Sequence, residues 1–153
     1  MLPSELDILL VQGDPLEAEL TLRPLQELGP EHRIGLARDG EEALDYLLSR
    51  GPFRHRLGAP APRLTLLDLR LPRLDGLDVL RALRSNPRTA LAPVVVLTSS
   101  GDAREVAQCY QLGANSCVQK PVEFAAFRER LQALARYWLE VNHPPPAPAA
   151  LAG

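Results

Sequence analysis

Five short apolar runs alternate along this sequence with longer segments of helical period, and this alternation constrains the fold more than any other feature. The apolar runs predict β-strands over residues 6–11, 33–37, 63–69, 93–98 and 116–119. A strand that is followed each time by a helix is typical of βαβ units, in which the strands lie parallel. The sequence therefore predicts an α/β fold of the order (βα)5, built on an open parallel sheet.

The predicted helices carry signals at their ends. Asp14 is expected to cap the first helix, with Pro15 at its first position and Glu17 three residues after the cap, and Gly29 closes it. Asp39 is expected to cap the second. The second helix is expected to stop at Gly51. The third helix is predicted over 75–85, the fourth over 102–112 with Gly113 just beyond its end, and the fifth over 123–141.

Two segments do not fit this pattern. Residues 51–62 contain prolines at positions 52, 60 and 62 and are predicted to form a surface loop, with His55 as a solvated loop histidine. Residues 142–153 are rich in proline and alanine and are predicted to form an extended, polyproline-like tail. One domain is thus expected over 5–141.

Composition excludes several classes of function. The 153 residues include 17 basic and 19 acidic side chains, for a net charge of −2, and no basic run is interleaved with aromatics, so nucleic acid is not an expected partner. The first residues lack a basic segment and no apolar run is long enough for a bilayer, so we expect a cytoplasmic protein without membrane contact. Cys109 and Cys117 fit neither a zinc nor a redox spacing and are expected to be reduced.

Polar residues are found where the predicted strands end. The third strand ends in Asp68, the fourth in Thr98 and the fifth just before Lys120, which is the only lysine of the chain. Ligands of open parallel sheets bind beyond the carboxyl ends of the strands. Asp68 alone could be a turn-starting aspartate, and Lys120 alone a surface lysine. A carboxylate, a hydroxyl and an ammonium group that converge on one edge instead favour a phosphate-handling site.

These residues belong to longer motifs. Leu66-Leu67-Asp68-Leu69 is followed by Pro72 and Asp75-Gly76, Val95-Val96-Leu97-Thr98-Ser99 comes next, and Gly113-Ala114-Asn115 precedes Lys120-Pro121. Over about residues 6–140 the chain resembles the receiver domain of two-component response regulators. Further segments resemble the single-domain regulators that accompany bacterial phytochrome kinases: Asp39 to Leu44, Arg50 to Phe53, Pro87 to Thr89 and Tyr137 to Asn142.

The resemblance implies a doubly wound sheet with the flavodoxin-like strand order 2-1-3-4-5, and a function. Asp68 would accept a phosphoryl group from a sensor histidine kinase, Thr98 would bind one phosphoryl oxygen, and Lys120 would neutralise another. Such a protein would be a phosphorelay component rather than an enzyme, catalysing at most its own phosphotransfer and dephosphorylation. Mg²⁺ would be held by Asp68, by the backbone carbonyl of Arg70, and by an acidic pair at the end of the first strand.

The acidic pair is missing from this sequence. It falls on Gln12 and Gly13, and the nearest carboxylate, Asp14, is already a candidate helix cap. Asp14, and Gln12 through water, are the candidate remaining metal ligands. The loss of a charge-assisted ligand should weaken metal binding by about 1.5–3 kcal/mol, so Mg²⁺ binding is expected to be weak. An alternative function is a non-phosphorylated pseudo-receiver that acts as a protein-interaction module.

Two further features stay open. Cys117 occupies the position where the family usually has an aromatic switch residue, and it could be a small buried apolar residue or a redox partner of Cys109. A switch would then act through Thr98 and the loop after it. The last helix carries more apolar residues than one stripe needs, so Trp138 could close the domain's own edge or contribute to a homodimer through this helix and the arm after it.

Overall fold

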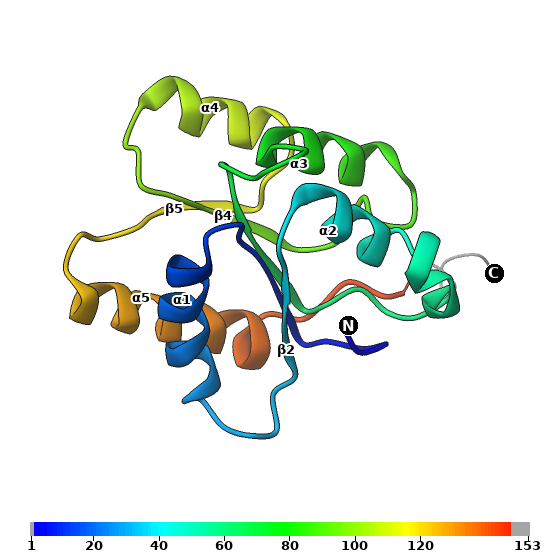
Figure 1. Cartoon of the computed structure of the whole chain (residues 1–153), viewed down its shortest axis with the longest axis horizontal. Coiled ribbons are helices and arrows are strands. Elements are labelled where there is room, and N and C mark those ends of the chain that lie inside the picture. The colour runs from blue at the N-terminus through cyan, green and yellow to red at the C-terminus, as the bar shows by residue number, and fades with distance from the viewer. Residues whose placement is uncertain (1, 148–153) are drawn as a thin grey trace.

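A five-stranded parallel sheet forms the centre of the molecule in the computed structural model, which describes residues 2–147 (Figure 1). The strand order is β2-β1-β3-β4-β5, as predicted. All five strands fall within the predicted runs: β1 Ile8–Val11, β2 Ile34–Ala37, β3 Leu64–Asp68, β4 Val94–Thr98 and β5 Ser116–Gln119. Strands β1 and β3 pair without interruption, and the last residue of β1, Val11, lies beside Leu67 of β3.

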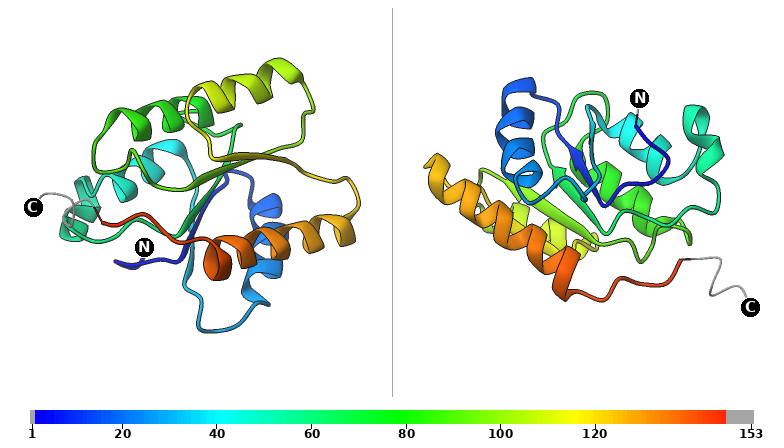
Figure 2. Two further views of the ribbon diagram at one scale, coloured as in Figure 1. Left: turned by 180° about the vertical axis from the view of Figure 1, so that it is seen from behind. Right: turned by 90° about the horizontal axis from the view of Figure 1, so that it is seen from below.

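Five α-helices cover the two faces of the sheet. Helices α1 and α5 lie on one face and α2, α3 and α4 on the other (Figures 1 and 2). Their bounds are α1 Pro15–Gln26, α2 Gly40–Leu47, α3 Gly76–Ser85, α4 Ala103–Gln111 and α5 Phe124–Arg136. This arrangement confirms the doubly wound α/β fold. Among residues 2–147, no helix has both the length and the apolar character needed to cross a membrane.

The core consists of two apolar clusters, one on each side of the sheet. Alternate residues of β1 divide between them: Leu9 and Val11 belong to the cluster under α2 and α3, whereas Ile8 and Leu10 belong to the cluster under α1 and α5. Every residue of β3 and β4 is buried. Strands that are covered on both faces need apolar side chains throughout, which is why Asp68 at the end of β3 is conspicuous.

Aspartates cap four of the helices. The carboxylates of Asp14, Asp39, Asp75 and Asp102 each accept a backbone N–H from the first turn of α1, α2, α3 and α4. Side-chain acceptors at this position satisfy amide groups that the helix itself leaves without a partner. The predicted caps are therefore confirmed, including the capping role of Asp14.

The prediction of a plain surface loop over 51–62 is wrong in its first half. Residues Gly51–Arg56 form a 3₁₀-helix, η1, in which His55 is exposed. Arg56 is buried, stacks on the ring of Tyr46, and donates to the carbonyl oxygens of Ser4 and Tyr46. A buried guanidinium with several carbonyl partners stabilises a short helix that proline spacing alone did not reveal.

The last predicted helix ends differently from the prediction. Helix α5 ends at Arg136, and residues Tyr137–Val141 continue as a π-helical turn, η2. Trp138 packs against the apolar cluster under α1 and α5, and its ring meets that of Tyr137 edge to face at 5.2 Å. Trp138 thus covers the edge of its own domain.

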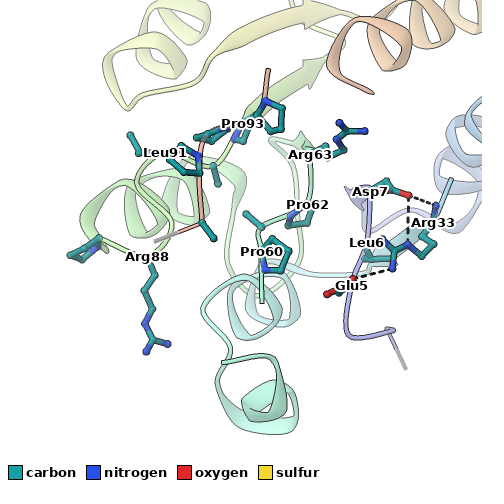
Figure 3. Close-up of a pocket in the computed structure, with 17 residues that line it drawn as sticks. Glu5, Leu6, Asp7, Arg33, Pro60, Pro62, Arg63, Arg88, Leu91 and Pro93 are labelled. Atoms are coloured by element: carbon teal, nitrogen blue, oxygen red, sulfur yellow. Dashed lines mark hydrogen bonds and ion pairs between the residues drawn. The ribbon is translucent and has the colours of Figure 1, made fainter. Parts of the chain in front are cut away.

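Beyond η2 the chain crosses the sheet at the amino ends of the strands. Pro144 and the residues up to Ala147 line a hollow of about 280 Å³ together with Asp7, Arg33 and Pro93 (Figure 3). Residues 144–147 form no helix or strand. The remainder of the predicted tail, 148–153, lies outside the described residues. This hollow is at the opposite edge of the sheet from Asp68.

Arg84 joins helix α3 to the loop before β4 and to the loop before β5. Its guanidinium donates to the carbonyl oxygens of Gly113, Thr89, Ala90 and Ala92 and to the side chain of Asn115. Burial lowers the pKa of Arg84. One side chain therefore satisfies backbone acceptors on both sides of β4.

We predict that Arg84→Ala lowers the free energy of unfolding by about 2–3 kcal/mol, because several part-buried carbonyl oxygens lose their donor. Urea unfolding measured by circular dichroism tests this. The matched control is Arg81→Ala on the same helix, which removes only an exposed ion pair with Asp78 and should cost less than about 1 kcal/mol. Equal losses in the two variants would contradict this role of Arg84.

Candidate functional site

The carboxyl ends of β1, β3, β4 and β5 meet at one edge of the sheet because the strands are parallel. Asp68 ends β3, Thr98 ends β4, and Gln12 and Lys120 directly follow β1 and β5. The Lys120 N–H donates to the Thr98 carbonyl at 2.8 Å and so extends the ladder between β4 and β5. The sheet thus brings together the carboxylate, hydroxyl and ammonium groups that the sequence placed at this edge.

Asp68 is buried, and both of its carboxylate oxygens have donors. Oδ1 accepts the N–H of Arg70 at 3.0 Å. Oδ2 accepts the side-chain amide of Gln12 at 2.8 Å and also the ammonium group of Lys120. A buried charge is costly unless it is paired, so these three contacts make an ionised Asp68 tolerable at this position.

A second carboxylate belongs to the same network. Glu17, in the first turn of α1, places its Oε2 at 3.2 Å from Gln12 Nε2 and 3.4 Å from Lys120 Nζ. Both nitrogens therefore bridge the same two oxygens, Asp68 Oδ2 and Glu17 Oε2. The Lys120 side chain is only 12% exposed, whereas that of Glu17 is half exposed, so the network runs from the interior to the surface.

Glu17, three residues after the Asp14 cap, is not the reciprocal acceptor of a capping box. In a capping box the glutamate would accept the N–H of Asp14. That N–H is instead donated to Gln12 Oε1 at 3.0 Å, while the Asp14 carboxylate accepts the N–H groups of Leu16 and Glu17. Gln12 has taken the place of the reciprocal acceptor, and Glu17 is left to reach Lys120.

Thr98 is held by a glutamate that lies outside the sequence motifs. Its hydroxyl donates to Glu105 Oε1 of α4 at 2.8 Å and accepts the N–H of Ser100 at 3.0 Å. A hydroxyl has one proton to donate. In this arrangement Thr98 cannot donate to any other acceptor until it leaves Glu105.

Mg²⁺ needs oxygen ligands in an octahedral arrangement. Of the predicted ligands, Asp68 and the Arg70 backbone are adjacent, but Asp14 caps its own helix and Gln12 presents nitrogen to Asp68. Within residues 2–147, no three His, Cys, Asp or Glu side chains converge as a metal-binding group. The arrangement therefore lacks the set of oxygen ligands that would hold a divalent ion tightly.

The two cysteines lie beside this site without entering it. Cys109 of α4 is buried and Cys117 of β5 is half-buried, and both are free thiols. Burial raises the pKa of the Cys109 thiol to about 11 and raises the pKa of Cys117 as well. Few thiolates form near neutral pH, which favours the apolar interpretation over a redox role.

An aromatic ring does reach position 117, but from another element. The hydroxyl of Tyr110 on α4 accepts the backbone N–H of Cys117 at 3.2 Å. Tyr110, Glu105 and Glu17 are the residues around the site that the sequence motifs did not reveal. Glu17 and Glu105 are acidic residues in the first turns of the helices that follow β1 and β4, which is the only sequence signal they carry.

Comparison with known proteins agrees with this geometry. The family model of the response regulator receiver domain matches residues 8–132. The probable methanogenesis regulatory protein FilR2 of Methanothrix harundinacea is 39% identical over 139 residues, which cover 90% of this chain and 86% of that protein.

Solved structures of similar proteins include phytochrome-related regulators. The Mn²⁺-bound form of response regulator Rcp1 superposes with a TM-score of 0.83 at 32% identity, covering 93% of this chain and all of the other. The phosphorylated cyanobacterial phytochrome response regulator RcpA superposes with a TM-score of 0.84 at 30% identity, covering 93% of this chain and 99% of the other. With the family model matched over most of its length, this chain belongs to the response regulator receiver family, whose members are signalling proteins rather than conventional enzymes.

Proposed function

We propose that this protein is a phosphorelay response regulator that accepts a phosphoryl group on Asp68. The observation that carries the proposal is the buried Asp68 carboxylate with the ammonium group of Lys120 on its Oδ2. Thr98 ends the neighbouring strand and is in register with Gln119, directly before Lys120. A carboxylate, a cation and a hydroxyl donor on three neighbouring strand ends are the groups that phosphoryl transfer to an aspartate requires.

The N–P bond of a phosphohistidine breaks, an O–P bond to a carboxylate oxygen of Asp68 forms, and the imidazole retains the electron pair of the broken bond and takes up a proton. The product is an acyl phosphate. Lys120 is placed to neutralise a phosphoryl oxygen, and Thr98 to donate its hydroxyl proton to another once it leaves Glu105.

The proposed donor is a sensor histidine kinase, and by analogy with the cyanobacterial phytochrome response regulator RcpA this kinase would have a phytochrome sensor. A hollow of about 270 Å³ opens beside Lys120 and is lined by Glu17, Leu20, Phe124 and Phe127 among others. Leu20 and Phe124 are exposed apolar side chains, and Val122 next to them is fully exposed. A partner that delivers a phosphoryl group to Asp68 must contact the surface around this hollow. Exposed apolar residues on that surface suit protein docking.

Two further assignments belong to the proposal. Mg²⁺ binding is proposed to be weak, since receiver domains bind Mg²⁺ but the acidic pair of this chain is replaced by Gln12 and Gly13. A homodimer through α5 and the arm after it is also proposed, because Phe124, Tyr137 and Val141 remain exposed along this surface.

The second candidate function is a pseudo-receiver that docks to partners without phosphorylation. The amide of Gln12 in contact with Asp68 favours this second function, because an amide nitrogen stands where a metal ligand would be needed. The two functions differ in whether Asp68 ever becomes an acyl phosphate.

Asp68→Asn is predicted to abolish labelling by a small phosphodonor such as acetyl phosphate or phosphoramidate, because an amide cannot form the acyl phosphate. Intact-mass spectrometry should show wild-type protein heavier by one phosphoryl group and the variant unchanged. The matched control, Asp78→Asn, changes a partly exposed carboxylate of α3 that pairs with Arg81, and this variant should be labelled like wild type. A wild-type protein that is never labelled, with or without Mg²⁺, would favour the pseudo-receiver.

Glu105→Ala is predicted to accelerate labelling, because the Thr98 hydroxyl no longer has to break a charge-assisted hydrogen bond before it reaches the phosphoryl group. Such a bond contributes about 1.5–3 kcal/mol, so the rate should rise by on the order of tenfold. Glu105→Gln keeps a neutral acceptor and should show a smaller increase. Glu129→Ala on the exposed surface of α5 is the control, and slower labelling of Glu105→Ala would contradict the proposed switch.

A further inference from the structure

Four polar atoms at the site form a closed ring. Gln12 Nε2 and Lys120 Nζ each contact both Asp68 Oδ2 and Glu17 Oε2. Two negative oxygens thus alternate with two nitrogen donors. The side chains come from the ends of β1, β3 and β5 and from the first turn of α1, so four separate elements hold the ring in place.

The orientation of the Gln12 amide is fixed by its neighbours. Its Oε1 accepts the N–H of Asp14, and its Nε2 faces two carboxylates. The reversed amide would place Oε1 against those carboxylates and the NH₂ group against an N–H donor, so all three contacts would be lost. Gln12 is only 4% exposed, which leaves it little freedom to turn away. It therefore presents a donor, not an oxygen ligand, to Asp68.

The neighbouring position offers no room for a ligand either. A Cβ atom added to Gly13 would lie 2.5 Å from Pro72 Cδ and 3.3 Å from the carbonyl oxygen of Arg38. Real Cβ atoms do not come so close to a proline ring, so any side chain at position 13 would require the loop after β3 to shift. The loop is packed into the space that a second acidic side chain would need.

We propose that the Gln12 amide and the Lys120 ammonium group together take the place of a divalent cation at Asp68. In this account the site holds its carboxylate ready without metal, and phosphorylation of Asp68 does not require Mg²⁺. The second part rests on the phosphoacceptor function proposed above. The Gln12 amide has only partial positive charge on its two N–H groups, and Lys120 supplies one full charge. Together they therefore supply part of the positive charge that a divalent ion would bring.

Glu17 is a positioning residue in this scheme. Its carboxylate contacts Gln12 Nε2 and Lys120 Nζ from the side opposite Asp68. Glu17 itself is half exposed, so it lies on the solvent side of these two nitrogens. When a phosphoryl group joins Asp68, Gln12 Nε2 and Lys120 Nζ, which already contact Asp68 Oδ2, would be placed to donate to its oxygens. Glu17 would keep those two nitrogens at the site.

The experiment combines metal binding with labelling. Wild type, Gln12→Glu and Gln26→Glu are titrated with Mg²⁺ and with Mn²⁺ by calorimetry, which does not depend on phosphorylation. Gln26 is exposed on α1, so its variant adds the same charge away from the site. Gln12→Glu should bind both ions more tightly than wild type by on the order of ten- to a hundredfold, and Gln26→Glu should match wild type. Wild-type binding as tight as that of Gln12→Glu would overturn the proposal.

Labelling with phosphoramidate then tests the second part. Wild type should be labelled at the same rate in Mg²⁺ and in EDTA, Gln12→Glu should become dependent on Mg²⁺, and Gln12→Met, which lacks the donor at similar size, should be labelled more slowly in EDTA. Wild-type labelling that occurs only with Mg²⁺ would overturn metal independence. A wild type that is unlabelled in both conditions would contradict the phosphoacceptor function, while calorimetry would still decide whether the amide excludes the metal.

Discussion

The structure of the site depends on one constraint, which is that a carboxylate ends a strand buried on both faces. Three donors pair with the buried Asp68 carboxylate: the Gln12 amide, the Lys120 ammonium group and the Arg70 N–H. Two of these donors, Gln12 and Lys120, directly follow β1 and β5 and are distant from Asp68 in the sequence, whereas Arg70 follows β3 itself. The register of the whole parallel sheet therefore determines the chemistry at this edge.

The first turns of two helices extend this network to the surface. Glu17 of α1 contacts Gln12 and Lys120, and Glu105 of α4 holds the Thr98 hydroxyl. Each glutamate engages a group that would have to move or act during phosphoryl transfer. Tyr110 joins the same helix α4 to the backbone of Cys117, so α4 contacts both Thr98 of β4 and the neighbouring strand β5. This arrangement agrees with a switch that does not need an aromatic residue at position 117.

The sequence was sufficient for most of the fold and for half of the site. Apolar runs marked all five strands, and aspartates marked the starts of four helices, because these signals are local. The partners of Asp68 and Thr98 were partly hidden, since Glu17 and Glu105 reach the site only through the directions of α1 and α4. The sequence predicts Gln12 as a metal ligand through water but not as a donor to Asp68, because the orientation of its amide is set by the Asp14 N–H. The short helix η1 depends on Arg56, whose buried contacts lie outside any sequence pattern.

Lys120 is the only lysine in the chain, so protein labelled with ¹⁵N-lysine gives one side-chain signal from the centre of the site. Nuclear magnetic resonance of this signal, recorded before and after addition of Mg²⁺ and then of phosphoramidate, tests most directly whether Lys120 and Gln12 serve Asp68 in place of a cation. We predict that Mg²⁺ leaves the Lys120 Nζ signal in place, that phosphoramidate shifts it, and that Asp68→Asn abolishes the second shift. A signal that moves with Mg²⁺ alone, or that phosphoramidate leaves unchanged in wild type, would contradict the account.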